Sequence, residues 1–312
     1  MISIKRYTAS DKTAWDNLIG QSKNGTFLFF RNYMDYHADR FTDHSCLIYR
    51  KEKLVAVFPA NMQDAVVYSH QGLTYGGLIY THKLSATDIL VIFEHLLQHY
   101  RDNKINKIIY KTVPYIYHDY PAQEDVYALF RNGARLTGCN LSATIPMKNK
   151  LKFTESRKSG LRKAQNLQLN CSHSIDFDAF WEILASNLGA KYEVRPVHSV
   201  EEIKYLHRLF PENIQLYTVG KGPDILAGVV LYICKKIVHV QYISAGYEGK
   251  ELGALDMLFD YLINTLYTDF DYFDFGQSTE QMGHVLNENL LFQKEGFGGR
   301  GIVYPVYEIN MD

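Results

Sequence analysis

The stretch IVHVQYISAGYEGKELGALDMLFDYLINTLY, residues 237–267, joins three local patterns in one continuous run. Residues 237–245 are rich in β-branched and aromatic side chains, which is typical of a strand. A glycine-bearing loop follows, and the next apolar residues recur at the spacing of one helix face. These residues are Leu255, Phe259, Leu262, Ile263 and Leu266. The sequence therefore predicts a strand, a glycine loop and a helix over residues 251–267.

The segments on either side extend this pattern. Upstream, IQLYTVGKGPDILAGVVLYI, residues 214–233, predicts a hairpin that turns around residues 220–224. Downstream, YFDFG, residues 272–276, predicts a closing strand with Phe273 and Phe275 on one face and Asp274 on the other, and we expect Gly276 to end it. Ligands collect beyond strand ends in open α/β sheets, so the polar residues after Gly276 are candidates for the edge of a site.

The first half of the chain repeats this order. A hairpin is expected over residues 46–60, a strand and glycine loop over 66–77, a helix capped by Ser85 over 85–104, and a closing strand over 107–114. Equivalent elements are offset by roughly 165–171 residues, and such self-similarity indicates a duplication. We expect an α+β protein of two tandem domains, residues 1–150 and 151–312, each a mixed sheet flanked by helices.

The composition narrows the class of protein. The chain has 312 residues, of which 46% are hydrophobic and 21% charged, as in ordinary globular proteins. A net charge of −1 argues against a surface built for nucleic acid. The four cysteines show no CxxC spacing, the first residues show no apolar core followed by a cleavage site, and no apolar run reaches about 18 residues. We expect reduced thiols, a cytoplasmic location and no membrane span.

The order of elements resembles the GNAT acyltransferase fold. The duplication resembles the FemAB-like branch, the non-ribosomal aminoacyl and acyl transferases with two tandem GNAT domains. FDFGQS, residues 273–278, looks like the closing strand of that family, and LLFQKEGFGGR, residues 290–300, resembles its FK-x-x-FG segment. The resemblance implies transfer of an acyl or aminoacyl group onto an amino group of a cell-envelope precursor or amino sugar, from acyl-CoA or aminoacyl-tRNA.

Two segments are candidates for binding the donor. A basic helix over residues 154–168 presents four cations for phosphate groups, at a place where FemAB-like proteins carry a similar segment. These cations are Arg157, Lys158, Arg162 and Lys163. The loop with Gly246 and Gly249 precedes a helix, whose free N–H groups suit a pyrophosphate. Glu248 and Glu251 in that loop would repel a pyrophosphate, and here the sequence departs from the simple GNAT loop.

Acyl transfer to an amine needs a proton acceptor and stabilisation of an oxyanion, and no covalent nucleophile. Asp274 is a candidate proton acceptor, and His70 is a second candidate base. The likeness of Lys294 to the family lysine implies that it polarises the carbonyl or binds an acidic part of the acceptor. The residues expected to bind substrate are Arg195, His198, Tyr242, Gln277, Ser278 and Glu280.

Other readings stay open. Ser199, with Glu202 three residues later, predicts a helix cap. HLLQH, residues 95–99, lacks the glutamate of a zinc protease motif and a third ligand, so we expect no metal site. The alternatives to the main reading are an acyl-CoA-dependent N-acetyltransferase of a small metabolite and an inactive tandem GNAT module that binds a sugar nucleotide or a protein. The oligomeric state is left open.

Overall fold

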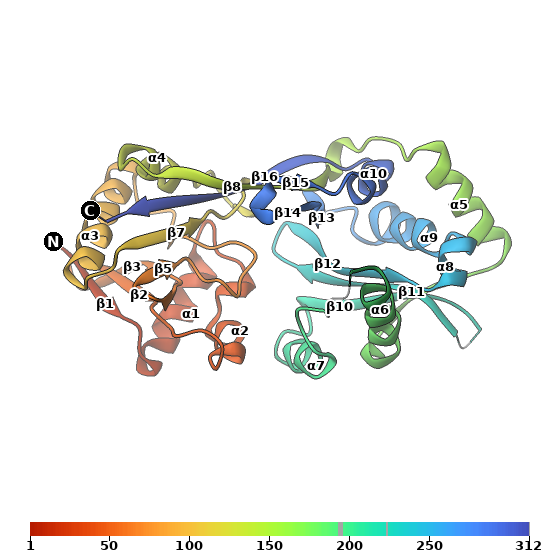
Figure 1. Ribbon diagram of the computed structural model, residues 1–312, viewed down its shortest axis with the longest axis horizontal. Helices are drawn as coiled ribbons and strands as arrows, with labels where there is room; N and C mark the ends of the chain where they lie inside the picture. The colour runs from red at the N-terminus through yellow and green to blue at the C-terminus, as the bar shows by residue number, and fades with distance from the viewer. Residues whose placement is uncertain (193–195, 223, 312) are drawn as a thin grey trace. The chain divides into compact units, whose positions relative to one another are not determined.

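The computed structural model describes residues 1–192, 196–222 and 224–311, and the chain forms two compact units (Figure 1). Unit 1 comprises residues 1–141, 279–286 and 303–312, and unit 2 comprises residues 142–278 and 287–302. Strands β8 (Arg135–Pro146) and β16 (Arg300–Asn310) contribute residues to both units. The second unit is thus interrupted by a short segment that belongs to the first.

The elements of unit 1 alternate short strands with helices. They are β1 (Ile2–Arg6), α1 (Lys12–Gln21), α2 (Arg31–Met34), β2 (Cys46–Arg50), β3 (Lys53–Phe58), β4 (Asn61–Gln63), β5 (Val66–Tyr68), β6 (Ile79–Tyr80), α3 (Ala86–Asp102), β7 (Lys107–Lys111), α4 (Glu124–Arg131), β14 (Thr279–Glu280) and β15 (Val285–Leu286). The strands form two main groups, in the orders β1-β2-β3-β6 and β4-β5-β7-β16. Helix α3 packs against β1 and α4, and encloses an apolar core that includes Phe93 and Tyr100.

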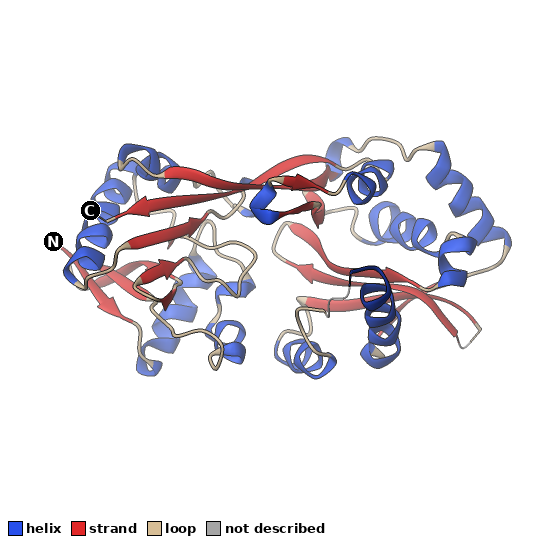
Figure 2. Cartoon of the chain, viewed as in Figure 1, coloured by secondary structure: helices blue, strands red, loops and turns tan. Residues whose placement is uncertain are grey.

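Unit 2 has one continuous sheet with helices on both faces (Figure 2). Its elements are α5 (Glu155–Asn166), β9 (Asn170–Ser174), α6 (Phe177–Tyr192), α7 (Val200–Leu209), β10 (Ile214–Lys221), β11 (Asp224–Ile233), β12 (Ile237–Ala245), α8 (Tyr247–Leu252), α9 (Ala254–Tyr261), β13 (Tyr272–Gln277) and α10 (Glu288–Gly296). The strand order is β8-β13-β12-β11-β10-β9. Helices α5 and α9 cover one face, and α6 covers β11 and β12 on the other.

The repeated pattern of the sequence is present in both units. Strands β2 and β3 pair antiparallel and β5 pairs parallel with β7, while β10 and β11 pair antiparallel and β12 pairs parallel with β13. The expected caps are also present, because Ser85 accepts a hydrogen bond from Asp88 N–H and Ser199 accepts one from Glu202 N–H. The prediction of an α+β fold with mixed sheets flanked by helices is confirmed.

Two local predictions were wrong. The helix expected over 251–267 is divided, because Gly253 adopts a left-handed φ of 76° between α8 and α9, and a π-helical turn follows at Leu262–Leu266. Strand β13 does not end at Gly276. It continues to Gln277 through an irregularity in its pairing with β8, where Gly276 has a φ of 75° that favours glycine.

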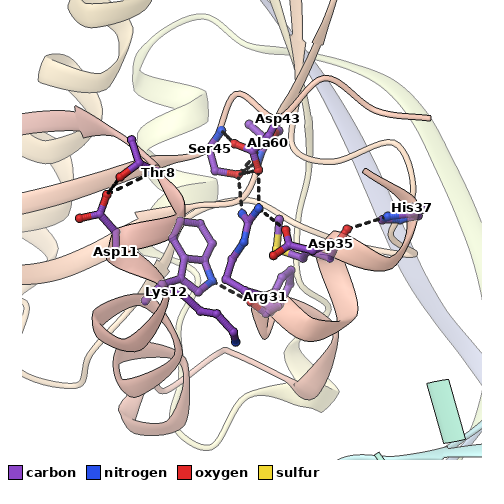
Figure 3. Close-up of polar contacts among 12 residues, drawn as sticks. Thr8, Asp11, Lys12, Arg31, Asp35, His37, Asp43, Ser45 and Ala60 are labelled. Carbon is purple, nitrogen blue, oxygen red and sulfur yellow. Dashed lines mark hydrogen bonds and ion pairs between the residues drawn. The ribbon is translucent and has the colours of Figure 1, made fainter. Parts of the chain in front are cut away.

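A buried arginine organises the first part of unit 1 (Figure 3). The Arg31 guanidinium donates to Asp35 Oδ1 at 2.5 Å and to Asp43 Oδ2 at 2.8 Å, and it lies 3.7 Å from the centre of the Tyr7 ring. Asp43 also accepts hydrogen bonds from Ser45, just before β2. Arg31 therefore ties α2 to the segment that leads into the sheet.

Replacing Arg31 by methionine tests this role. Arg31→Met removes a charge that is only 3% exposed and leaves two carboxylates that are partly hydrated, so we expect a loss of about 2 kcal/mol in the free energy of unfolding. Urea denaturation measures it. Arg101→Met, at an exposed position of α3, is the matched control and should change little. Equal unfolding free energies for the two variants would contradict the role of Arg31.

Candidate active site in unit 2

Among the residues of unit 2 whose burial the structure describes, Asp274 is the most deeply buried charged side chain, with none of its surface exposed. Its Oδ1 accepts hydrogen bonds from Ser142 Oγ at 2.5 Å and from Thr144 Oγ1 at 2.7 Å. Its Oδ2 lies 2.7 Å from Nδ1 of His239. These three donors replace the water that the carboxylate loses on burial.

The sheet brings these four residues together from three neighbouring strands (Figure 1). In β13, Phe273 and Phe275 pack in the core with Phe259 of α9, and Asp274 points to the opposite face because side chains alternate along a strand. The parallel register of β12 sets His239 beside Asp274, and the antiparallel register of β8 sets Thr144 beside it.

The contact with Asp274 fixes the chemistry of the His239 ring. A carboxylate accepts hydrogen bonds, so Nδ1 carries the proton that faces Asp274. In a neutral imidazole, Nε2 is then the basic nitrogen. No sequence pattern had indicated His239, Ser142 or Thr144 as site residues. The signal that was available is one acidic or basic side chain within each of two largely apolar strands, His239 in β12 and Asp274 in β13.

Lys294 lies in the last turn of α10, a helix capped by Asn287. Its ammonium donates to the carbonyl oxygens of Gly276, at 2.9 Å, and Gln277, at 2.7 Å. Burial lowers the pKa of Lys294 to about 8, and the charge of Asp274 opposes that shift. An ammonium has three donors, and the contacts among the described residues use two of them. The Lys294 ammonium therefore binds the same strand, β13, that carries Asp274, two residues beyond it.

The predicted substrate residues after Gly276 belong to two different units. Gln277 is half-buried and belongs with Ser278 to unit 2, whereas Glu280 lies exposed in β14 of unit 1. Ser278 is 1% exposed, and its Oγ has no hydrogen-bond partner among the described residues. A buried hydroxyl without a partner is costly and is often associated with a functional site.

Two predicted substrate residues, His198 and Tyr242, contact one another. The Tyr242 hydroxyl lies 2.5 Å from His198 Nδ1, and the Trp181 ring packs edge-on against Tyr242 at 5.0 Å. Burial raises the pKa of Tyr242 to about 12. His198 N–H also donates to the Tyr242 hydroxyl, so the pair connects β12 to the residue before the Ser199 cap of α7. Arg195 lies outside the described residues.

His70 belongs to unit 1 and is 3% exposed. Its ring stacks on His37 at 5.1 Å, and its backbone has a φ of 66°. Burial, together with positive neighbours, lowers the pKa of His70 to about 3. An imidazole with so low a pKa is a weak base at neutral pH, so the structure gives His70 little capacity to accept a proton.

The basic helix forms as α5, and its cations have different surroundings. Arg157 forms an ion pair with Asp256 at 3.0 Å and lies over the Phe297 ring, while Lys158 pairs with Glu155 at 2.6 Å. Lys163 donates to the carbonyl oxygen of Glu251. Arg162 is exposed. Three of the four predicted cations thus contact groups of unit 2 itself.

The predicted donor glycines flank the start of α8. Gly246 precedes the helix, and its N–H donates to the carbonyl oxygen of Leu226. A Cβ on Gly249 would lie 2.2 Å from that same oxygen, whereas one on Gly246 would lie 3.7 Å from it. Close packing between α8 and β11 accounts for glycine at 249.

Metal-binding clusters and membrane-spanning helices are absent from residues 1–192, 196–222 and 224–311. No group of three or more His, Cys, Asp or Glu side chains there is arranged to hold a metal ion. No helix within these ranges combines the length and apolar character needed to cross a bilayer.

Comparison with known protein families identifies the domain that contains His239 and Asp274. Residues 152–282 match the acetyltransferase (GNAT) domain family. Residues 152–282 form a GNAT domain. This match includes His239 and Asp274 and stops before Lys294. A search of curated proteins found no match.

Solved structures show the same fold over nearly the whole chain. FemX is similar with a TM-score of 0.71 at 10% identity, covering 99% of this chain and 97% of FemX. A conserved protein of unknown function from Bacteroides thetaiotaomicron has a TM-score of 0.63 at 12% identity, covering 99% and 100% of the two chains. The C-terminal domain of a putative lysylphosphatidylglycerol synthetase from Agrobacterium fabrum has a TM-score of 0.59 at 11% identity, covering 90% of each.

These matches bear on the expectations from the sequence. The prediction of a GNAT-type acyltransferase is confirmed by the family match, and the likeness to FemX confirms the predicted fold over nearly the whole chain. The chain is an acyltransferase, and the match locates the GNAT domain in the second half of the sequence.

The glycines of the α8 loop offer a test of packing. Gly249→Ala forces a shift between α8 and β11 and should lower the free energy of unfolding by about 1–3 kcal/mol. Gly246→Ala, with only an ordinary contact, is the matched control and should be close to wild type. Thermal unfolding compares them. Equal midpoints for the two variants would show that close packing does not require Gly249.

Proposed function

We propose that this protein transfers an acyl or aminoacyl group onto an amino group of a cell-envelope precursor or amino sugar. The observation that carries the proposal is the buried Asp274–His239 pair at 2.7 Å within the GNAT domain. Likeness to FemX and to a putative lysylphosphatidylglycerol synthetase supports the choice of an envelope acceptor and an aminoacyl donor. We propose a cytoplasmic reaction, because acyl-CoA and charged tRNA are cytoplasmic donors.

The reaction needs an amine without its extra proton. Amines of the lysine type have a pKa near 10.4 and arrive protonated at neutral pH. In the proposed reaction Nε2 of His239 takes that proton, while Asp274 holds Nδ1 and stabilises the imidazolium that forms. Because Asp274 is fully buried and already accepts three hydrogen bonds, we assign it a positioning role and assign the proton transfer to His239.

The free amine then attacks the donor carbonyl carbon. A new C–N bond forms, and the carbonyl oxygen becomes an oxyanion. The positive charge of Lys294 stabilises that oxyanion. When the tetrahedral intermediate collapses, the donor oxygen or sulfur leaves with its electron pair and takes the proton from His239, and the nitrogen of the new C–N bond releases its second proton to solvent. Protein, amide product and released donor then balance without any covalent intermediate on the chain.

The acyl-CoA-dependent acetyltransferase of a small metabolite is a second candidate. The family that matches residues 152–282 is described as an acetyltransferase domain, which favours a thioester donor. Both candidates use the same base and cation, and they differ in the donor and the acceptor.

The purified full chain can be assayed for transfer directly. Acetyl-CoA or a mixture of charged tRNAs serves as donor, and a UDP-linked amino sugar or a mixture of polyamines serves as acceptor, with the amide product detected by mass spectrometry. We expect product with the charged tRNAs and the amino sugar, and about a 100-fold or greater loss of turnover in His239→Gln. His173→Gln, at an exposed position of β9, is the matched control. Product from acetyl-CoA and a polyamine alone supports the second candidate, and full turnover in His239→Gln contradicts both.

Lys294 makes the reaction sensitive to alkaline pH. Its pKa is lowered to about 8, so the ammonium is lost as pH rises through 8, and kcat/KM should fall by about tenfold for each further pH unit. Lys294→Arg keeps a positive charge throughout this range. The pH profile of this variant should lack the alkaline fall, whatever its absolute rate. An alkaline fall at the same pH in Lys294→Arg would exclude Lys294 as its origin.

The variant Ser278→Ala distinguishes a role of this hydroxyl in substrate binding from a role in protein stability. Its buried hydroxyl has no partner among the described residues, so Ser278→Ala should unfold at the same or a higher temperature than wild type. If the hydroxyl binds the substrate, the same variant should raise KM by about 5- to 10-fold. Steady-state kinetics and thermal unfolding are measured on one preparation. Unchanged kinetics would remove Ser278 from the site.

A further inference from the structure

A pocket of about 700 Å³ opens in unit 1, between α1, the turn of the β2–β3 hairpin and residues 81–84. None of the residues predicted for catalysis or for binding lines it. Its volume lies in the range typical of small-molecule sites. It is therefore a separate candidate site, independent of the proposed reaction.

The floor of the pocket is aliphatic. Leu18, Val55 and Leu84 line it and are each less than 9% exposed, and Leu54 is half-buried beside them. No Phe, Tyr or Trp side chain is among the lining residues, although these types make up 14% of the chain. Ligands with aromatic rings are commonly held by aromatic side chains, so this floor suits an alkyl chain better than a nucleobase.

The rim of the pocket is cationic. Lys51, Lys53 and Lys83 are exposed around it, and the described residues include no carboxylate paired with any of the three. Arg50 also lines the pocket and pairs with Asp88 at 2.9 Å. No Asp or Glu is among the lining residues. Glu52, between two of these lysines in the turn, does not line the pocket, so the lining residues carry a net positive charge that suits a phosphate or a carboxylate.

The turn of the hairpin does not itself call for lysine. Lys51 has a φ of 48° and Glu52 a φ of 63°, a left-handed pair that two-residue hairpin turns usually fill with Asn-Gly. A lysine in this conformation is less favourable than an asparagine. Its ammonium at the pocket rim provides a reason for the lysine that the backbone does not.

We propose that this pocket binds an anionic amphiphile, with its alkyl chain on the aliphatic floor and its phosphate or carboxylate between the rim lysines. A free single-chain compound and a lipid in a bilayer both present this chemistry. The pocket in either case gives the chain a second binding site, apart from the Asp274 cluster.

Titration calorimetry measures the affinity of the full chain for decyl phosphate, at concentrations below micelle formation. Decyl phosphate should bind. Inorganic phosphate, which lacks the alkyl chain, and decyl maltoside, which lacks the anionic group, should each bind at least tenfold more weakly. The double variant Lys51→Asn with Lys83→Gln should weaken binding by about three- to tenfold. Lys104→Gln with Lys221→Gln makes the same change of charge at exposed positions away from the pocket, and should bind like wild type.

Two further measurements show whether the variants still fold and whether the ligand is a free compound or a lipid in a bilayer. Asparagine suits the left-handed turn, so Lys51→Asn should unfold no earlier than wild type while binding more weakly. Sedimentation with phosphatidylcholine vesicles, with and without phosphatidylglycerol, shows whether a bilayer supplies the ligand, since only the anionic vesicles should be bound through Lys51 and Lys83. Binding of decyl phosphate alone assigns a free ligand. Equal binding by the pocket and control variants, or equal binding of decyl maltoside and decyl phosphate, overturns the proposal.

Discussion

The buried carboxylate of Asp274 is the constraint on which unit 2 depends. It accepts hydrogen bonds from β8 and from β12, and so joins three adjacent strands through one side chain. A carboxylate with no exposed surface is tolerated only when its lone pairs are satisfied, and here Ser142, Thr144 and His239 satisfy them. Any shift of register between these strands would separate the acceptor from its donors. The polar cluster therefore specifies the pairing as well as the site.

The consequences extend along β13. Two residues after Asp274, the left-handed backbone of Gly276 coincides with a change in the pairing with β8, and the carbonyl oxygens of Gly276 and Gln277 accept hydrogen bonds from Lys294. These carbonyls favour the charged amine, while burial disfavours it. The result is a cation whose charge is retained at neutral pH and lost in mildly alkaline solution. The end of β13 thus positions the proposed base His239 through the Asp274 side chain, and it positions the Lys294 ammonium through two backbone carbonyl oxygens.

Local sequence signals predicted much of the fold. Capping residues Ser85 and Ser199 and the paired apolar runs fixed the helices and hairpins, because these signals act within a few residues. The break at Gly253 was not predicted, since its glycine is required where α8 and α9 meet the backbone of Gly160, far away in the sequence.

The site was harder to predict for the same reason. Asp274 and Lys294 were found by pattern and resemblance, but His239 becomes a partner of Asp274 only once β12 and β13 are known to pair in parallel register. Arg157 carried the charge expected of a phosphate site, yet its partner Asp256 lies 99 residues later and was invisible in the sequence. Charge runs show where cations occur, and tertiary contacts decide which of them stay available.

The tautomer of His239 decides whether this residue can act as the proposed base, because the basic Nε2 is a consequence of the hydrogen bond between Nδ1 and Asp274. Nitrogen-15 NMR of histidine-labelled protein at neutral pH distinguishes a protonated ring nitrogen from a basic one, and His239→Gln assigns the signal. The hydrogen bond predicts a proton on Nδ1 and a basic Nε2, and a change of that pattern in Asp274→Asn. A neutral ring protonated on Nε2 in the wild-type protein would contradict it, since Nε2 could then accept no proton from an amine.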